Sequence, residues 1–189
     1  MKNASSQPSD KAHEAGERLC KPLPPRREPQ NCGDIDMRIG RDGTWYYQGS
    51  PIGRKELVCL FASVLKRTAE GEYWLITPAE MGRIQVEDAP FVAVQMYCCN
   101  GGHQVLSFRT NIDECVTAGT ANPIRVAFDP ETGEPRPYIL VREGLEARIE
   151  RSVYYELVAY GHEEDINGER VFGVWSSGTF FPLGKLEED

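Results

Sequence analysis

The sequence of 189 residues has no long hydrophobic run. Its longest mostly apolar stretches, Leu57–Leu65 and Phe91–Cys99, are nine residues each. A membrane-spanning helix needs about 20 apolar residues, so we expect neither a membrane span nor a membrane partner. The N-terminal segment also lacks the apolar core of a secretory signal. We therefore expect a cytoplasmic protein.

Basic residues are also in short supply. The chain has 21 lysines and arginines against 29 aspartates and glutamates, which gives a net charge of −8. Proteins that bind nucleic acid neutralise backbone phosphates with an excess of lysine and arginine. The charge balance therefore argues against a nucleic-acid partner.

Histidine is scarce, and the familiar catalytic motifs are missing. The chain has three histidines. Ser50 lies in Gly49-Ser-Pro-Ile-Gly, where Pro51 removes the backbone N–H that would serve an oxyanion hole. No phosphate-binding loop or dinucleotide-binding glycine motif is present. We expect no cofactor, and a binding protein rather than an enzyme.

The six cysteines contain no Cys-x-x-Cys pair. Cys98 and Cys99 end a predicted strand, where adjacent side chains point to opposite faces. With His103 and Cys115 they include the ligand types that zinc prefers. A hairpin whose turn ends in His103 explains the same residues, so we expect reduced thiols and no metal site.

Residues 1–33 differ in composition from the rest. They hold five of the 13 prolines, with six basic and four acidic residues, so that residues 34–189 carry a charge of −10. Such a segment has too little apolar surface to offset the entropy of ordering. We predict a flexible arm with polyproline character near Pro22–Pro25. A proline-rich ligand for a partner domain is the alternative.

Beyond the arm, strand and turn patterns alternate with two helical ones. Leu57, Leu60, Phe61, Val64 and Leu65 form one stripe at helical spacing, which predicts a helix that faces a sheet containing Tyr73–Thr77, with Lys66 and Arg67 at its end. A second helix is predicted over Glu146–Gly161, from the ladder of Ile149, Val153, Leu157 and Tyr160. Strands are predicted at 35–39, 44–48, 73–77, 83–86, 91–99, 104–109, 124–128, 138–142, 171–176 and 179–183.

Each predicted helix precedes a Gly-Glu turn and an aromatic strand. These are Gly71-Glu-Tyr-Trp-Leu-Ile-Thr and Gly168-Glu-Arg-Val-Phe-Gly-Val-Trp-Ser. The echo suggests two copies of a strand–helix–strand unit. We predict two domains, 34–90 and 91–189.

Several short motifs resemble a bacterial family, catalogued as domain of unknown function 1285. They are Trp45 with Gly49-Ser-Pro-Ile and Arg54, Tyr73-Trp-Leu-Ile-Thr-Pro, Val86-Glu-Asp-Ala-Pro-Phe, Gly144-Leu-Glu-Ala, Arg151-Ser-Val-Tyr-Tyr-Glu-Leu-Val and Gly173-Val-Trp-Ser. The resemblance covers about residues 43–184. It implies a two-domain α+β fold, each domain a curved, mainly antiparallel sheet packed by one helix. It also implies a loose likeness to pleckstrin-homology domains and a role in signal transduction, without catalytic residues.

Three charged residues are the candidate ligand-binding residues: Arg54, Glu80 and Asp88. Arg54 precedes the first predicted helix, where the helix dipole opposes a cation. We expect a carboxylate, Glu80 or Asp88, to pair with it, and a bound anion is the alternative. Glu80, Glu87 and Asp88 otherwise serve as turn and ion-pair residues.

Two functions from different classes fit these observations. The first is a binding or regulatory module whose domain interface is filled and whose aromatic residues pack in the core or contact a protein partner. The second is a small enzyme or a sensor of a small molecule or anion, with Arg54, Glu80 and Asp88 in a cleft between the domains. A ligand-sized pocket with convergent polar groups favours the second.

Overall fold

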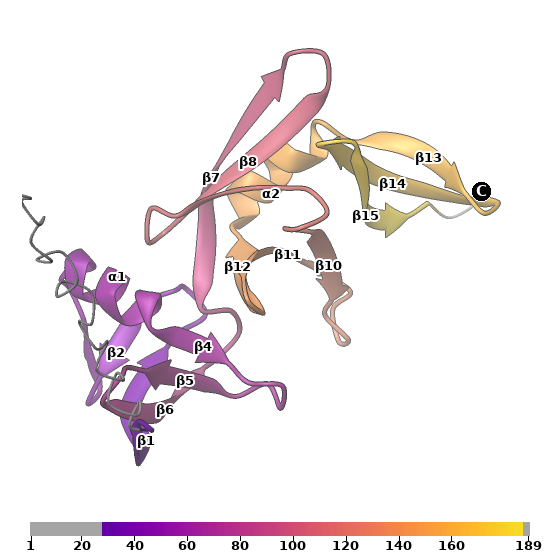
Figure 1. The fold of residues 1–189 in the computed structure, drawn as a ribbon. Coiled ribbons are helices and arrows are strands. Elements are labelled where there is room, and N and C mark those ends of the chain that lie inside the picture. The colour runs from indigo at the N-terminus through magenta and orange to yellow at the C-terminus, as the bar shows by residue number, and fades with distance from the viewer. Residues whose placement is uncertain (1–27, 187–189) are drawn as a thin grey trace, which may run out of the picture.

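A computed structural model describes residues 28–186, which form two α+β domains built mainly of strands (Figure 1). The first strand, β1, spans Gln30–Ile39. The predicted arm therefore ends too late at residue 33, because residues 30–33 already belong to β1, which pairs with β6 from Gln30 onward. The remainder of the predicted arm, residues 1–27, lies outside the described residues.

The first sheet consists of two three-stranded meanders. Its strands are β1, β2 (Trp45–Tyr47), β3 (Ser50–Pro51), β4 (Leu65–Arg67), β5 (Tyr73–Ile76) and β6 (Glu80–Val86). The strand order is β3-β2-β1-β6-β5-β4. The central strands β1 and β6 run parallel, and every other pair is antiparallel.

The second sheet repeats this topology. Its strands are β7 (Phe91–Asn100), β8 (Gln104–Thr110), β9 (Cys115–Thr117), β10 (Ile124–Phe128), β11 (Pro135–Arg142) and β12 (Leu145–Ile149). The order is β10-β11-β12-β7-β8-β9, and only the central pair, β12 and β7, is parallel. The repeat thus joins residues 30–86 with 91–149. The sequence echo aligned the two helices instead. In the structure the first helix lies between the meanders of its sheet, and the second follows the last strand of its sheet.

The first helix, α1, is shorter than predicted and spans Lys55–Ser63. Leu65 and the two following cations belong to β4, so they do not end the helix. Phe61 stacks on Trp45 of the sheet, with ring centroids 6.2 Å apart. Two members of the predicted stripe, Leu57 and Leu60, are exposed, so the stripe as a whole does not face the sheet.

The second helix, α2, spans Arg151–Val158. It begins later than predicted because residues 145–149 form strand β12, in which Leu145, Ala147 and Ile149 are buried at the two-residue spacing of a strand. A third sheet follows, with β13 (His162–Ile166), β14 (Glu169–Ser176) and β15 (Thr179–Lys185) in that order.

The buried side chains of both domains form one continuous core. The hydroxyl of Ser176, fully buried, connects the third sheet to the second: it accepts a hydrogen bond from the Leu106 N–H at 2.9 Å and donates one to the Ala118 carbonyl at 2.7 Å. Within residues 28–186, neither helix has the length and apolar character needed to cross a membrane.

Candidate functional site

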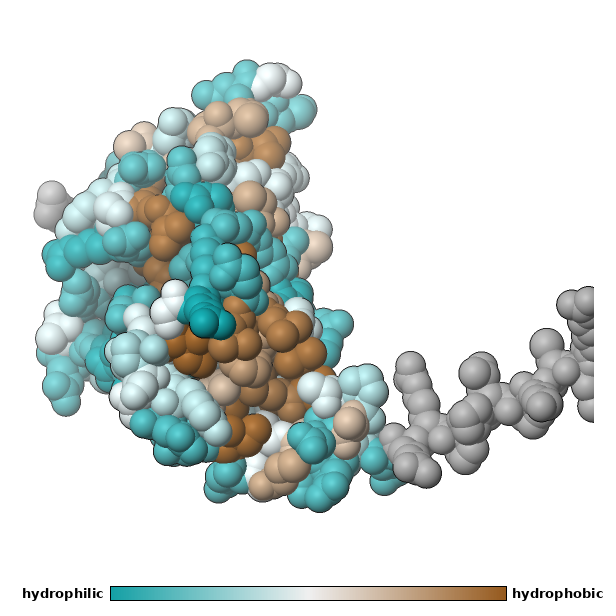
Figure 2. All heavy atoms as spheres, turned by 90° about the vertical axis from the view of Figure 1, so that its left-hand side faces the viewer, coloured by the Kyte–Doolittle hydropathy of each residue, from teal (hydrophilic) through white to brown (hydrophobic). Residues whose placement is uncertain are grey.

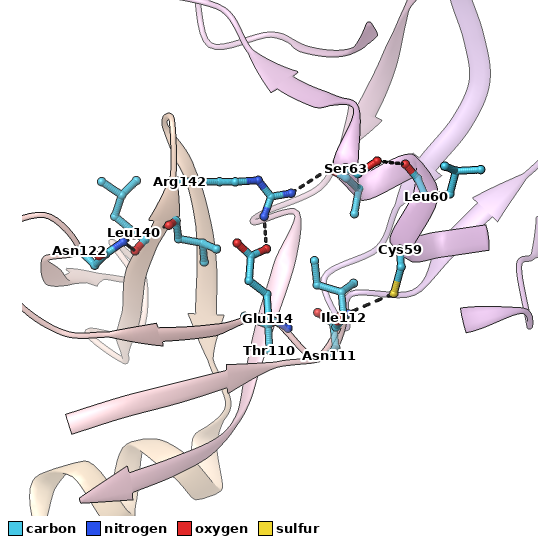
Figure 3. A network of polar contacts seen from close by, with 12 residues as sticks. Cys59, Leu60, Ser63, Thr110, Asn111, Ile112, Glu114, Asn122, Leu140 and Arg142 are labelled. Atoms are coloured by element: carbon cyan, nitrogen blue, oxygen red, sulfur yellow. Dashed lines mark hydrogen bonds and ion pairs between the residues drawn. The ribbon is translucent and has the colours of Figure 1, made fainter. Parts of the chain in front are cut away.

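One side of the domain junction is filled by α1. Lys55, Cys59 and Ala62 follow one another at helical spacing and face the second domain. The Lys55 ammonium pairs with Asp113 at 2.5 Å, and the Cys59 thiol donates to the Ile112 carbonyl at 3.6 Å (Figure 3). On this side of the junction the two domains therefore contact each other directly through α1.

Arg142 connects the two domains at the end of α1 (Figure 3). Its Nη2 donates to the Ala62 carbonyl at 2.8 Å, its Nη1 pairs with Glu114, and its guanidinium lies 5.2 Å from the centre of the Phe91 ring. Carbonyls in the last turn of a helix have no partner within the helix. Arg142 therefore supplies, from the second domain, a hydrogen bond that α1 cannot make for itself.

A groove of about 490 Å³ opens elsewhere at the junction. Its lining combines arginines, carboxylates and an apolar wall: Arg41, Glu87, Asp88, Glu134, Pro135, Arg136, Pro137, Arg148, Ile149, Glu150, Arg151, Tyr154 and Tyr155. Arg41 comes from the first domain, Glu87 and Asp88 from the connector, and the rest from the second domain. The volume is within the range of about 300–1,000 Å³ typical of small-molecule sites.

Asp88 is held at the groove by the second domain. The Tyr138 hydroxyl donates to Asp88 Oδ1 at 2.7 Å, and Arg148 Nε lies 3.7 Å from Asp88 Oδ2. The Arg125 guanidinium lies 4.2 Å from the centre of the Tyr138 ring. Burial, together with the hydrogen bond and charge of Asp88, raises the pKa of Tyr138 to about 12. Tyr138 is therefore protonated at neutral pH and acts as a donor.

The arginines of the groove have spare hydrogen-bonding capacity. Arg148 Nε is buried 3.7 Å from Asp88 Oδ2 and forms no hydrogen bond among residues 28–186. Arg151 contacts Glu134 at 3.4 Å, with both side chains largely exposed. Within the same residues the Arg41 side chain takes part in no hydrogen bond or ion pair. An arginine carries five N–H donors, so the guanidinium groups of these arginines retain donors for a further anionic partner.

The N-terminus of α2 also opens onto the groove. Glu150 is the N-cap residue, and no side chain of the described residues caps the helix. Glu150, Arg151 and Tyr154 all line the groove. The free backbone N–H groups of the first helical turn and the helix dipole add positive potential at this point.

The three predicted ligand-binding residues are not brought together. Asp88 lines the groove, whereas Glu80 begins β6, six residues and about 20 Å along the strand from Val86. Arg54 is the N-cap residue of α1, and its side chain forms no ion pair with residues 28–186. The predicted pairing of Arg54 with Glu80 or Asp88 is therefore wrong, because Asp88 is occupied by Tyr138 and Arg148.

Sequence reasoning missed the arginines that line the groove. Arg41 and Arg148 are far apart in sequence, and only the junction brings them to one groove. Arg151 could have been found: a cation in the first turn of a helix is the signal that drew attention to Arg54. The predicted helix began at residue 146, whereas α2 begins at Arg151. The prediction therefore placed Arg151 beyond the first turn.

The cysteines are free in the described residues. Cys98 is half-buried, while Cys99 and Cys115 are exposed. Across residues 28–186 no three histidine, cysteine or acidic side chains gather as metal ligands would.

Comparison with known proteins places the chain in a family. Residues 24–89 match the model of the N-terminal domain of unknown function 1285 (DUF1285), and residues 90–183 match the model of the C-terminal domain of the DUF1285 protein of unknown function. No curated protein matches the chain.

Two crystal structures are similar to the protein. A DUF1285 family protein from Silicibacter pomeroyi DSS-3 is 52% identical, with a TM-score of 0.78 over 84% of this chain and 85% of that one. A DUF1285 family protein from Shewanella baltica OS155 is 27% identical, with a TM-score of 0.52 over 66% of this chain and 91% of that one. The two family models together match well over half of the sequence, and the chain belongs to the DUF1285 family.

Proposed function

We propose that this protein is a binding module that holds a small anionic ligand in the groove at the domain junction. The observation that carries the proposal is the presence of Arg41 and Arg148, with unused donors, on a groove of about 490 Å³. Arginine presents a planar fork of donors that suits carboxylate and phosphate groups. The ligand class is therefore a small molecule with a carboxylate or phosphate group.

The rest of the groove suits such a ligand. Four arginines and four carboxylates line it, but Glu87 pairs with Arg38 outside the groove, and Asp88 accepts from Tyr138. Glu87 and Asp88 are thus more fully engaged than Arg41. Tyr154 and the two prolines supply an apolar wall for the body of the ligand.

The lining favours binding over turnover. It contains no histidine, cysteine or serine that could act as a nucleophile or neutral-pH base. Burial raises the pKa of Tyr154, which keeps this phenol protonated. Since both domains contribute to the groove, a bound ligand would alter their contact, which supports a regulatory role.

A thermal-shift panel tests this proposal with phosphate, pyrophosphate, acetate and citrate. The proteins are wild type, the double variant Arg41→Gln/Arg148→Gln, and the control Arg170→Gln, whose exposed pair with Glu163 lies on the third sheet. An anion at about 100 times its Kd adds about 2.7 kcal/mol of stability, which raises Tm by about 5–10 °C. We expect a rise in Tm of this size for wild type and for the Arg170→Gln control. Equal shifts in all three proteins, or none in any, would overturn the proposal.

A further inference from the structure

Helix α1 carries an apolar surface that neither domain covers. Around the helix, Val58, Phe61 and Ala62 pack toward the first sheet, and Lys55, Cys59 and Ala62 face the second domain. Leu57 and Leu60 are on neither of these sides and are 37% and 60% exposed. Among residues 28–186, no side chain covers the exposed parts of these two leucines.

Tyr47 extends this surface. Trp45 stacks on Phe61, and Tyr47, two residues further along β2, lies on the same face of the sheet. Tyr47 is 46% exposed. We call Tyr47, Leu57 and Leu60, together with the part of Phe61 that the sheet leaves exposed, the α1 patch. Figure 2, which views the molecule from the side of α1, shows hydrophobic side chains gathered in one continuous area.

One edge of the α1 patch, at the start of the helix, is positively charged. Arg54 immediately precedes the helix, and no carboxylate within residues 28–186 pairs with it. No side chain among these residues caps α1, so its first-turn N–H groups add positive potential beside Arg54. Glu56, the only carboxylate of the helix, precedes Leu60 by one turn and so borders the α1 patch on the edge opposite Arg54. A carboxylate from outside would therefore compensate Arg54.

Apolar side chains beside an unpaired cation define the chemistry of a partner. We propose that the α1 patch docks an amphipathic helical segment of a partner protein, with apolar residues one turn apart and a carboxylate at the end that meets Arg54. Such segments bind grooves and helix faces through residues at i, i+3, i+4 and i+7. The charge of −10 on residues 34–189 disfavours an anionic lipid surface as the occupant. This inference is independent of the groove.

Selection from a displayed library of helical peptides tests the proposal. The library varies the apolar face and the charges at both ends, and the bait is the full chain. The selected peptides are then measured by fluorescence anisotropy against Leu60→Ser, Arg54→Gln and a control, Phe128→Ser. Phe128 is 56% exposed in β10 and lies outside the α1 patch.

We expect acidic residues at one end of the selected peptides. Leu60→Ser should weaken binding at least tenfold, Arg54→Gln should abolish the preference for acidic over basic ends, and Phe128→Ser should change neither. Because Leu60 is exposed, Leu60→Ser should keep its Tm within about 2 °C of wild type. Peptides that bind Leu60→Ser as well as wild type would overturn the proposal. So would a dimer of the wild type, seen by sedimentation, that Leu60→Ser converts to monomer, since the occupant would then be a second copy.

Discussion

At the scale of single residues, the junction depends on a few polar side chains with several partners each. Arg142 serves three groups at once: the Ala62 carbonyl, the Glu114 carboxylate and the Phe91 ring. Asp88 similarly joins Tyr138 and Arg148. Substituting a residue of this kind should lower the free energy of unfolding by more than substituting a residue of an exposed surface ion pair.

Arg142→Ala should lower the free energy of unfolding by about 2 kcal/mol. This lies between the roughly 0–1 kcal/mol of an exposed pair and the 3–5 kcal/mol of a broken buried one, since both partners are about two-thirds buried. Urea denaturation measures it, with Arg170→Ala, in an exposed pair with Glu163, as the control. In a double-mutant cycle with Glu114→Gln, a coupling near zero would refute the link between Arg142 and Glu114.

Tyr138→Phe should alter how stability depends on pH. The folded-state pKa of Tyr138, about 12, is above its usual value of 10.0, so the protonated phenol stabilises the fold. This stabilisation is complete below about pH 10 and is lost as the pH rises to about 12. At pH 7, losing the hydrogen bond to Asp88 should cost about 1 kcal/mol.

The stability advantage of wild type over Tyr138→Phe should therefore fall above pH 10, by about 1.4 kcal/mol at pH 11, so that it disappears or changes sign. Urea denaturation at pH 7, 9, 10 and 11 gives the comparison, and lysines that titrate in this range affect both proteins equally. A difference that stays constant over the range would contradict the shifted pKa of Tyr138.

At the scale of elements, the helices show how far periodicity alone can predict the fold. The stripe correctly located α1, but the same leucines are consistent with a core face and with an exposed face. The burial of Phe61 against Trp45 and the exposure of Leu60 depend on where the sheet lies, which no local pattern specifies.

The second helix was misplaced for a related reason. Ile149 continues the helical ladder of Val153 and Leu157, and it also continues the strand alternation of Leu145 and Ala147. Pairing of β12 with β7 and β11 decides in favour of the strand. The groove depended on this boundary, since Arg148 belongs to the strand and Arg151 to the helix.

Truncating one partly buried and one exposed apolar residue of α1 distinguishes the packed face of the helix from its exposed face. Phe61→Ala should lower the free energy of unfolding by about 2–3 kcal/mol, below the 3–5 kcal/mol typical of a fully buried Phe because Phe61 is only partly buried. Leu60→Ala should cost less than about 1 kcal/mol because the side chain is 60% exposed. Chemical denaturation of both variants is the measurement. Equal losses would mean that Leu60 packs as the sequence pattern suggested.

At the scale of the whole molecule, two sheets of the same topology are held together from two sides. On one side α1 fills the junction, and on the other the connector and Arg41 close a groove against β12 and α2. A ligand in that groove would contact both domains. The proposed ligand site thus lies where binding would be coupled to domain contact.

Isothermal titration calorimetry of the anion with the largest thermal shift tests the central claim most directly. The account predicts one site per chain for wild type and for Arg170→Gln, and at least tenfold weaker binding for Arg41→Gln and for Arg148→Gln, since each removes a charged donor worth about 1.5–3 kcal/mol. Full affinity in both groove variants would show that the anion binds elsewhere and would contradict the assignment of the groove as a ligand site.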